Sequence, residues 1–112
     1  MSLKHPTTKV PDEVSEMFRK IKNVADYLAD TKNEGCEIPS EFEIAGVESI
    51  AKLATQAEDA MLADHDEITP RIWEIQGLAE TMAAAARAGR RLPASNYHVI
   101  EELADRVEEL LQ

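Results

Sequence analysis

Few residues in this sequence have types and spacings that could support chemistry, and the clearest group is His98 with Glu101 and Glu102. Residues three or four positions apart share one face of a helix, so an imidazole and a carboxylate at this spacing can pair or hold a metal. Di-iron bundles use Glu-x-x-His pairs, however, and neither Glu-x-x-His nor Asp-x-x-His occurs in this chain. We therefore predict no metal ligands. The three residues form either a solvent-facing ion pair or polar contact in the first turn of a helix, or a polar pocket inside a helical bundle.

The one basic cluster of the sequence consists of Arg87, Arg90 and Arg91. Three guanidinium groups so close together could bind an anion or an acidic segment of a partner. Cations are also favourable at a helix C-terminus, where they complement the helix dipole. The cluster is therefore a candidate anion or partner contact, with helix termination as the alternative reading.

Other sequence features exclude several kinds of site. The four glycines lie too far apart for a dinucleotide-binding or phosphate-binding loop, and no Gly-x-Ser-x-Gly motif is present. Asp64 and Asp66 match the first two ligands of a calcium loop, but Ile68 cannot serve as the third. Cys36 lies between two glutamates, whose charge disfavours the reactive thiolate. We expect no catalytic residue, no cofactor and no metal, and lean against an enzyme.

Charge and composition restrict the partners and the compartment. The chain carries 22 acidic and 12 basic residues and a net charge of −10, which argues against direct nucleic-acid binding. No apolar run approaches the ~18 residues of a membrane span, and no secretory signal is recognisable. A single cysteine cannot form an intrachain disulfide. We therefore expect a cytoplasmic protein that does not bind membranes.

The elements that would position these side chains are helices. Apolar residues recur at alternating spacings of three and four in four stretches, and no stretch alternates with the period of a strand. The stretches are Asp12 to about Asp30, Ser40 to about Ala63, Thr69 to about Gly89, and Ser95 or Asn96 onward. The helix-start signals are Asp12, a capping box of Ser40 and Glu43, Thr69 before Pro70, and Ser95 or Asn96; Gly89 is expected in the left-handed conformation.

Four helices with short connections predict an all-α fold, a four-helix bundle of up-and-down antiparallel topology. We expect a single domain over residues 12–112 after a flexible segment over residues 1–11. With 112 residues and five aromatic side chains the core is modest, and the small residues Ala83, Ala84, Ala85 and Ala86 would let a second helix approach closely. We therefore predict a homodimer that uses this alanine block.

Function follows mainly from these exclusions. The leading hypothesis is a small acidic helical interaction module, an adaptor or regulatory subunit without catalytic activity, that binds a protein partner. The alternative is an enzyme or enzyme subunit with a polar pocket near His98, Glu101 and Glu102, for which a shifted pKa would be the sign. A third hypothesis is an inhibitor whose acidic helices mimic nucleic acid.

Overall fold

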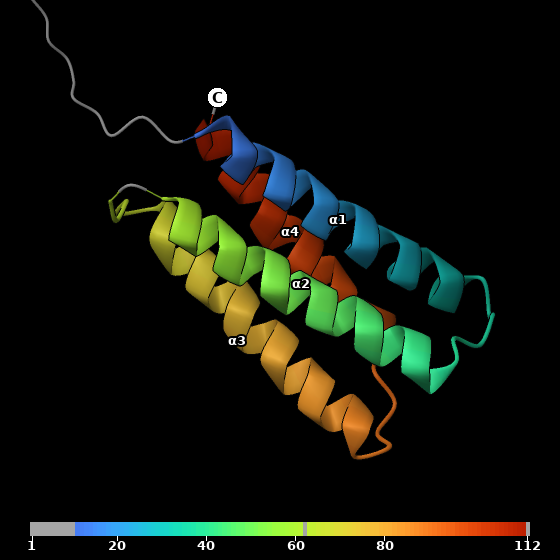
Figure 1. The fold of residues 1–112 in the computed structure, drawn as a ribbon. Coiled ribbons are helices and arrows are strands. Elements are labelled where there is room, and N and C mark those ends of the chain that lie inside the picture. Colours follow the sequence, from blue (N-terminus) through green and yellow to red (C-terminus); the bar gives the residue numbers. More distant parts are fainter. Residues whose placement is uncertain (1–10, 62, 112) are drawn as a thin grey trace, which may run out of the picture.

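The structure, a computed structural model, describes residues 11–61 and 63–111, which form four α-helices (Figure 1). The helices are α1 (Asp12–Asn33), α2 (Ser40–Ala60), α3 (Ile68–Arg87) and α4 (Ala94–Leu111). No strand occurs within those two ranges. The predicted all-α fold is confirmed, and none of the helices is long and apolar enough to cross a membrane. The predicted flexible segment, residues 1–11, lies outside the described residues except for Pro11.

The helices form a closed ring of neighbours. Helix α1 packs against α2 and α4, and α3 packs against the same two helices, whereas the backbones of the diagonal pairs do not come close together. Each connection reverses the direction of the chain, as Figure 1 shows. This is the predicted up-and-down antiparallel four-helix bundle. The loops 34–39 and 88–93 consequently lie together at one end of it.

The core is built from the apolar stripes that the sequence pattern predicted. One stripe residue in each turn is fully buried, among them Phe18 on α1, Ile50 on α2, Ile72 on α3 and Ile100 on α4. Burial of one such apolar side chain contributes about 1.5 to 3 kcal/mol to folding. Within the described chain the hydrophobic effect of these stripes therefore holds the four helices together.

Helices α1 and α2 begin one residue earlier than the cap signals predicted, and α4 begins two or three residues earlier; the three starts lie directly after Pro11, Pro39 and Pro93. Pro11 and Pro39 have extended backbones, and neither α1 nor α2 has a side-chain cap. The predicted caps at Asp12 and Ser40 are therefore wrong, as are those at Ser95 and Asn96, since α4 already contains both. The reason is that an extended proline supplies the non-helical backbone that precedes a helix, which leaves the next residue inside the first turn.

Helix α3 begins with an unpredicted cap, His65. Its Nδ1 accepts hydrogen bonds from the backbone N–H groups of Glu67 at 3.2 Å and Ile68 at 3.3 Å. In return, the N–H of His65 donates to Oγ1 of Thr69 at 2.8 Å. This reciprocal pair works as a capping box does. The predicted cap at Thr69 is wrong, because this residue lies buried within α3 and serves as the second partner.

Two helices end in the same way. Gly35 and Gly89 have positive φ angles of 79° and 81°, so the prediction for Gly89 is confirmed. After α1, the N–H of Cys36 donates to the carbonyl of Thr31; after α3, that of Arg90 donates to the carbonyl of Ala85. These are Schellman motifs, which satisfy the last carbonyl groups of a helix. Gly35 thus stops α1 at Asn33 rather than near Asp30, whereas α2 ends at Ala60, short of the expected Ala63.

Gly77, in the middle of α3, offers a test of helix energetics. A methyl group added there would meet no heavy atom within 4 Å, and the backbone is helical. Because alanine loses less conformational freedom in a helix, we expect Gly77→Ala to raise the free energy of unfolding by about 1 kcal/mol. Urea denaturation would measure this. Gly46→Ala is the contrasting variant, since its methyl would lie 3.0 Å from Leu28 Cδ1, and an equal gain in both would contradict the packing of α1 on α2.

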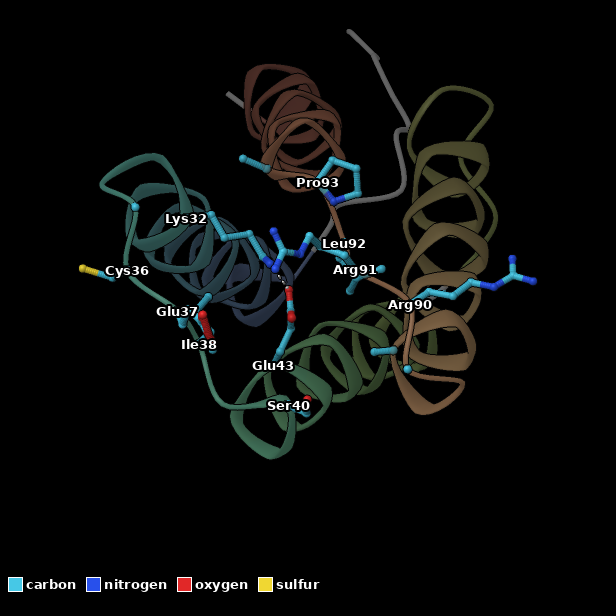
Figure 2. Close-up of a pocket in the computed structure, with 14 residues that line it drawn as sticks. Lys32, Cys36, Glu37, Ile38, Ser40, Glu43, Arg90, Arg91, Leu92 and Pro93 are labelled. Carbon is cyan, nitrogen blue, oxygen red and sulfur yellow. Dashed lines mark ion pairs between the residues drawn. The ribbon is translucent and has the colours of Figure 1, made fainter.

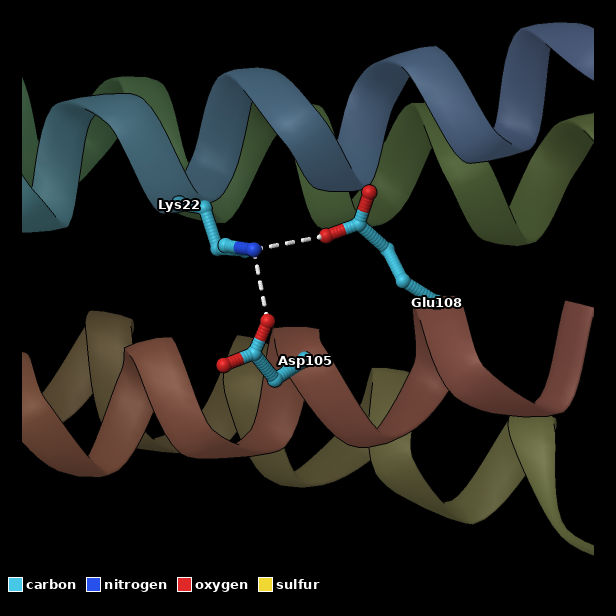
Figure 3. A network of polar contacts seen from close by, with 3 residues as sticks. All are labelled: Lys22, Asp105 and Glu108. Carbon is cyan, nitrogen blue, oxygen red and sulfur yellow. Dashed lines mark hydrogen bonds and ion pairs between the residues drawn. The ribbon is translucent and has the colours of Figure 1, made fainter.

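Polar contacts between helices surround this core. Figure 3 shows Lys22 of α1 between two acids of α4, with its Nζ 2.6 Å from Asp105 Oδ1 and 3.0 Å from Glu108 Oε1. These hydrogen bonds, the one to Asp105 first, raise the pKa of Lys22. On the other side, the indole Nε1 of Trp73 donates to Glu58 Oε2 at 2.6 Å and lowers the pKa of that carboxyl. Such contacts fix the register of neighbouring helices more than they stabilise the fold.

Candidate functional site

A cleft of about 740 Å³ opens at the end of the bundle where the loops 34–39 and 88–93 meet (Figure 2). Its wall is formed by these loops together with Lys32 near the end of α1, Ser40 and Glu43 at the start of α2, and Ala94 at the start of α4. Each of the four helices has one end near this cleft. Charged side chains thus converge at one end of a bundle whose core is otherwise apolar.

Glu43 is the centre of this cleft, and only 8% of its surface is exposed. Its Oε2 accepts a hydrogen bond from the hydroxyl of Tyr97 at 2.6 Å and lies 2.9 Å from Nζ of Lys32. The three residues come from α2, α4 and α1. A buried carboxylate needs such partners, since desolvation without them would be costly. We call Lys32, Glu43 and Tyr97 the buried triad.

Burial keeps Tyr97 as a hydrogen-bond donor. The ring is fully buried, and burial together with the adjacent carboxylate of Glu43 raises the pKa of Tyr97 well above its ordinary value. Its hydroxyl therefore remains protonated at any physiological pH. Tyr97 positions Glu43 and does not act as a base.

The buried triad corrects the predicted capping box. Ser40 makes no cap hydrogen bond, and the carboxylate of Glu43 turns inward to Tyr97 instead of back to the helix start. A sequence signal for this placement exists. Glu43 lies four residues before Val47, in line with the buried stripe of α2, and Tyr97 lies three before Ile100 in that of α4.

The three arginines do not form one cluster. Arg87 pairs with Glu48 and so links α3 to α2. In Figure 2 the side chain of Arg90 points away from the cleft, whereas the guanidinium of Arg91 points into it, toward Lys32 and Glu43. Within the described ranges Arg91 forms no ion pair with an acidic side chain. Of the predicted anion contact, Arg90 and Arg91 both line the cleft, but only Arg91 directs its guanidinium into it.

The predicted polar pocket lies on the surface rather than inside the bundle. His98 is half exposed, with its Nδ1 3.1 Å from Glu101 Oε1 and its Nε2 3.4 Å from Asn33 Nδ2. Glu102 is exposed. Burial raises the pKa of Glu101 most, the contact with the carboxyl of Asp26 on α1 raises it further, and His98 lowers it. The raised pKa thus arises at a partly buried contact between two helices and not in the predicted pocket.

The Asp26 and Glu101 pair predicts a pH dependence of stability. A carboxyl with a raised pKa binds its proton more tightly in the folded chain, so acidification through that pKa stabilises the fold. Asp26→Asn removes the neighbouring carboxyl that raises the pKa of Glu101, and near neutral pH it should raise the free energy of unfolding by about 0.5 kcal/mol. The gain should shrink as protonation of Glu101 relieves the same repulsion. Thermal unfolding across pH would measure it, and an equal gain from Asp30→Asn, an exposed acid on the same helix, would contradict the pair.

A second cavity, an apolar groove of about 710 Å³, runs along the outside of α1 and α2. Tyr27 of α1 and Phe42 of α2 line it and are 70% and 71% exposed, the highest values of any large hydrophobic residue that the structure describes. Val24, Leu28 and Gly46 also line it, and a methyl group at Gly46 would touch Leu28. We call this feature the α1–α2 groove.

Negative charge is concentrated in the segment that includes the loop end of the α1–α2 groove. The segment 33–51 contains five acids and no lysine or arginine. Two of these acids are paired, Glu43 with Lys32 and Glu48 with Arg87. The other three, Glu34, Glu37 and Glu41, are exposed, and Glu37 lines the groove. The apolar α1–α2 groove thus has an acidic edge.

The structure divides the alanine block. Ala83 and Ala86 are buried in the core of the same chain, whereas Ala84 is exposed and Ala85 is partly buried. Only the latter two can therefore contact a second chain.

The described residues contain no group of three or more His, Cys, Asp or Glu side chains placed to hold a metal ion.

Comparison with known proteins adds no family to this description. No protein-family model, curated protein or solved structure matches the chain.

Proposed function

We propose that this protein is a small acidic interaction module, an adaptor or regulatory subunit, that binds a basic amphipathic helix of a partner protein in the α1–α2 groove. The observation that carries this proposal is the placement of Tyr27 and Phe42. Both rings are more than two thirds exposed, and both line one apolar groove. Exposed aromatic side chains at a groove are the usual anchors of a protein interface.

The groove suits a helix. It lies between two antiparallel helices, and a third helix laid along it would bury its apolar face against Tyr27 and Phe42. Its depth comes from Gly46, where the missing side chain leaves Leu28 as the floor. A partner helix would insert large apolar residues at spacings of three and four.

The acidic edge selects the charge of the partner. Glu34, Glu37 and Glu41 would pair with lysines or arginines on the flank of a bound helix, which favours encounter and orientation. A second copy of this chain is a poor occupant, because each of its helices carries acids and its net charge is −10. Nucleic acid is disfavoured for the same reason.

A model peptide tests the groove. The probe is a helical peptide with leucines on one face and lysines on the other, titrated into the ¹⁵N-labelled protein. We expect shifts at Tyr27, Phe42 and Gly46, and Phe42→Ala should weaken binding roughly tenfold. Because Phe42 is mostly exposed, its replacement should leave the fold intact.

The controls separate the groove from general charge attraction. Val99→Ala removes an exposed apolar residue of α4 that does not line the groove and should leave the affinity unchanged. A peptide with glutamates in place of lysines should not bind. Equal weakening by Phe42→Ala and Val99→Ala, or shifts confined to other helices, would reject the proposal.

Assembly and location extend this proposal. We propose a cytoplasmic homodimer in which the exposed Ala84 and the partly buried Ala85 of α3 contact a second chain, away from the α1–α2 groove. Small side chains permit close helix approach at such a contact. Light scattering coupled to gel filtration measures the mass, and a value near the 12.5 kDa of one chain would reject the dimer.

A further inference from the structure

We infer that the cleft at the bundle end is a binding site for a small organic anion, a carboxylate or phosphate that carries a neighbouring hydroxyl or ammonium group. The anionic group would bind Arg91, and the neighbouring donor would bind Glu43. This site is separate from the α1–α2 groove in its chemistry, and it does not depend on the function proposed there.

The charge balance of the cleft supports an anion. Lys32 and Glu43 neutralise each other, since Nζ and Oε2 are 2.9 Å apart. The guanidinium of Arg91 points into the same space and has no acidic partner among the described residues (Figure 2). Over all the charged side chains that line the cleft, the three cations Lys32, Arg90 and Arg91 exceed the two acids Glu37 and Glu43 by one positive charge. A guanidinium presents paired N–H donors that match the two oxygens of a carboxylate or phosphate.

The backbone at this end adds to that preference. Schellman motifs satisfy the last carbonyl groups of α1 and α3 within the chain, which reduces the negative contribution of these helix ends. At the start of α2 no side chain caps the free N–H groups, so the positive contribution of this helix end is not reduced. Ser40 lines the cleft at that point, and its hydroxyl makes no cap hydrogen bond.

Glu43 supplies the second half of the recognition. Tyr97 and Lys32 both contact its Oε2, while its Oε1 accepts no hydrogen bond from the residues that the structure describes. This carboxylate is more than nine-tenths buried and lines the cleft. A buried acceptor without a donor is unfavourable, and a ligand hydroxyl or ammonium would satisfy it. Glu43 would therefore favour an anion that carries a neighbouring hydroxyl or ammonium group over an anion that lacks one.

Two pairs of matched probes and variants test this site. Glycolate and acetate differ by one hydroxyl, and inorganic phosphate tests the other anion; each is titrated into the ¹⁵N-labelled protein. We expect glycolate to shift the amides of Arg91, Ala94 and Tyr97 and to bind about threefold more tightly than acetate, as one added hydrogen bond predicts. Stronger binding of phosphate than of glycolate would show that the anionic group of the ligand is a phosphate. Weaker binding of phosphate would show that it is a carboxylate.

The variants separate the site from surface attraction. Arg91→Ala should weaken glycolate binding roughly tenfold, whereas Arg90→Ala, which removes the adjacent cation that points away, should not. Glu43→Gln should abolish the preference for glycolate over acetate. Equal loss in both arginine variants, or no shift at the cleft with any of the three probes, would overturn the inference, whatever the peptide experiment on the groove shows.

Discussion

Glu43→Ala is expected to lower the free energy of unfolding by about 3 kcal/mol. The reason is that the substitution leaves one buried group and one half-buried group without their partner. Tyr97 is fully buried and would retain a hydroxyl with no acceptor, and the Nζ of Lys32 would lose its counter-charge. An unpaired buried donor alone costs about 1 to 3 kcal/mol. Chemical denaturation monitored by circular dichroism would measure the loss.

Two variants make this result specific to the buried triad. Glu41→Ala removes an exposed acid two residues earlier on the same helix and should change stability by no more than about 0.5 kcal/mol. In Tyr97→Phe the hydroxyl is absent, so adding Glu43→Ala to it should cost less than it does in the parent chain. Additive losses in the double variant would show that the two residues do not interact.

Phe18→Ala is expected to have the largest effect, a loss of about 4 kcal/mol. Phe18 is fully buried on α1 and is one of the largest side chains of the core. Removing it forfeits the transfer free energy of the ring and leaves a cavity that the packed helices cannot close. Stabilities of small domains are about 5 to 15 kcal/mol, so a large part of the fold's stability would be lost.

A smaller change keeps this prediction measurable if the alanine variant does not fold. Phe18→Leu retains most of the volume and should cost roughly 1 to 2 kcal/mol. Arg19→Ala, at the exposed neighbouring position, should have almost no effect. A loss from Phe18→Leu no larger than that from Arg19→Ala would contradict the burial of this face of α1.

Both predictions concern features that the sequence revealed to different degrees. The position of Phe18 in the core follows from the helical spacing of apolar residues, because an apolar stripe has one stable place in water, which is against another stripe. Glu43 was open to two readings. Its distance from Ser40 matched a capping box, and its distance from Val47 matched the stripe. Pro39 decided between them, since a helix that begins directly after proline leaves Ser40 inside the first turn.

The candidate sites depended more on tertiary structure than the helices did. Arg87, Arg90 and Arg91 are close in sequence, yet they point toward α2, away from the cleft and into the cleft, because the chain leaves the helix between the first and the last of them. Lys32, Glu43 and Tyr97 are far apart in sequence and meet at Oε2 of one carboxylate. Spacing along one helix predicts which residues share a face, but it contains no information about which helix lies opposite.

The sequence by itself therefore determined the number of helices, their apolar faces and the antiparallel bundle, since each follows from local periodicity and from short connections. Only the tertiary structure decided which polar residues are buried together, where α1 and α2 leave a groove, and which arginine faces a cavity. These depend on contacts between residues distant in the chain. Such contacts are set by how the helices pack, and a buried charge such as that of Glu43 is tolerated only where that packing brings it a partner.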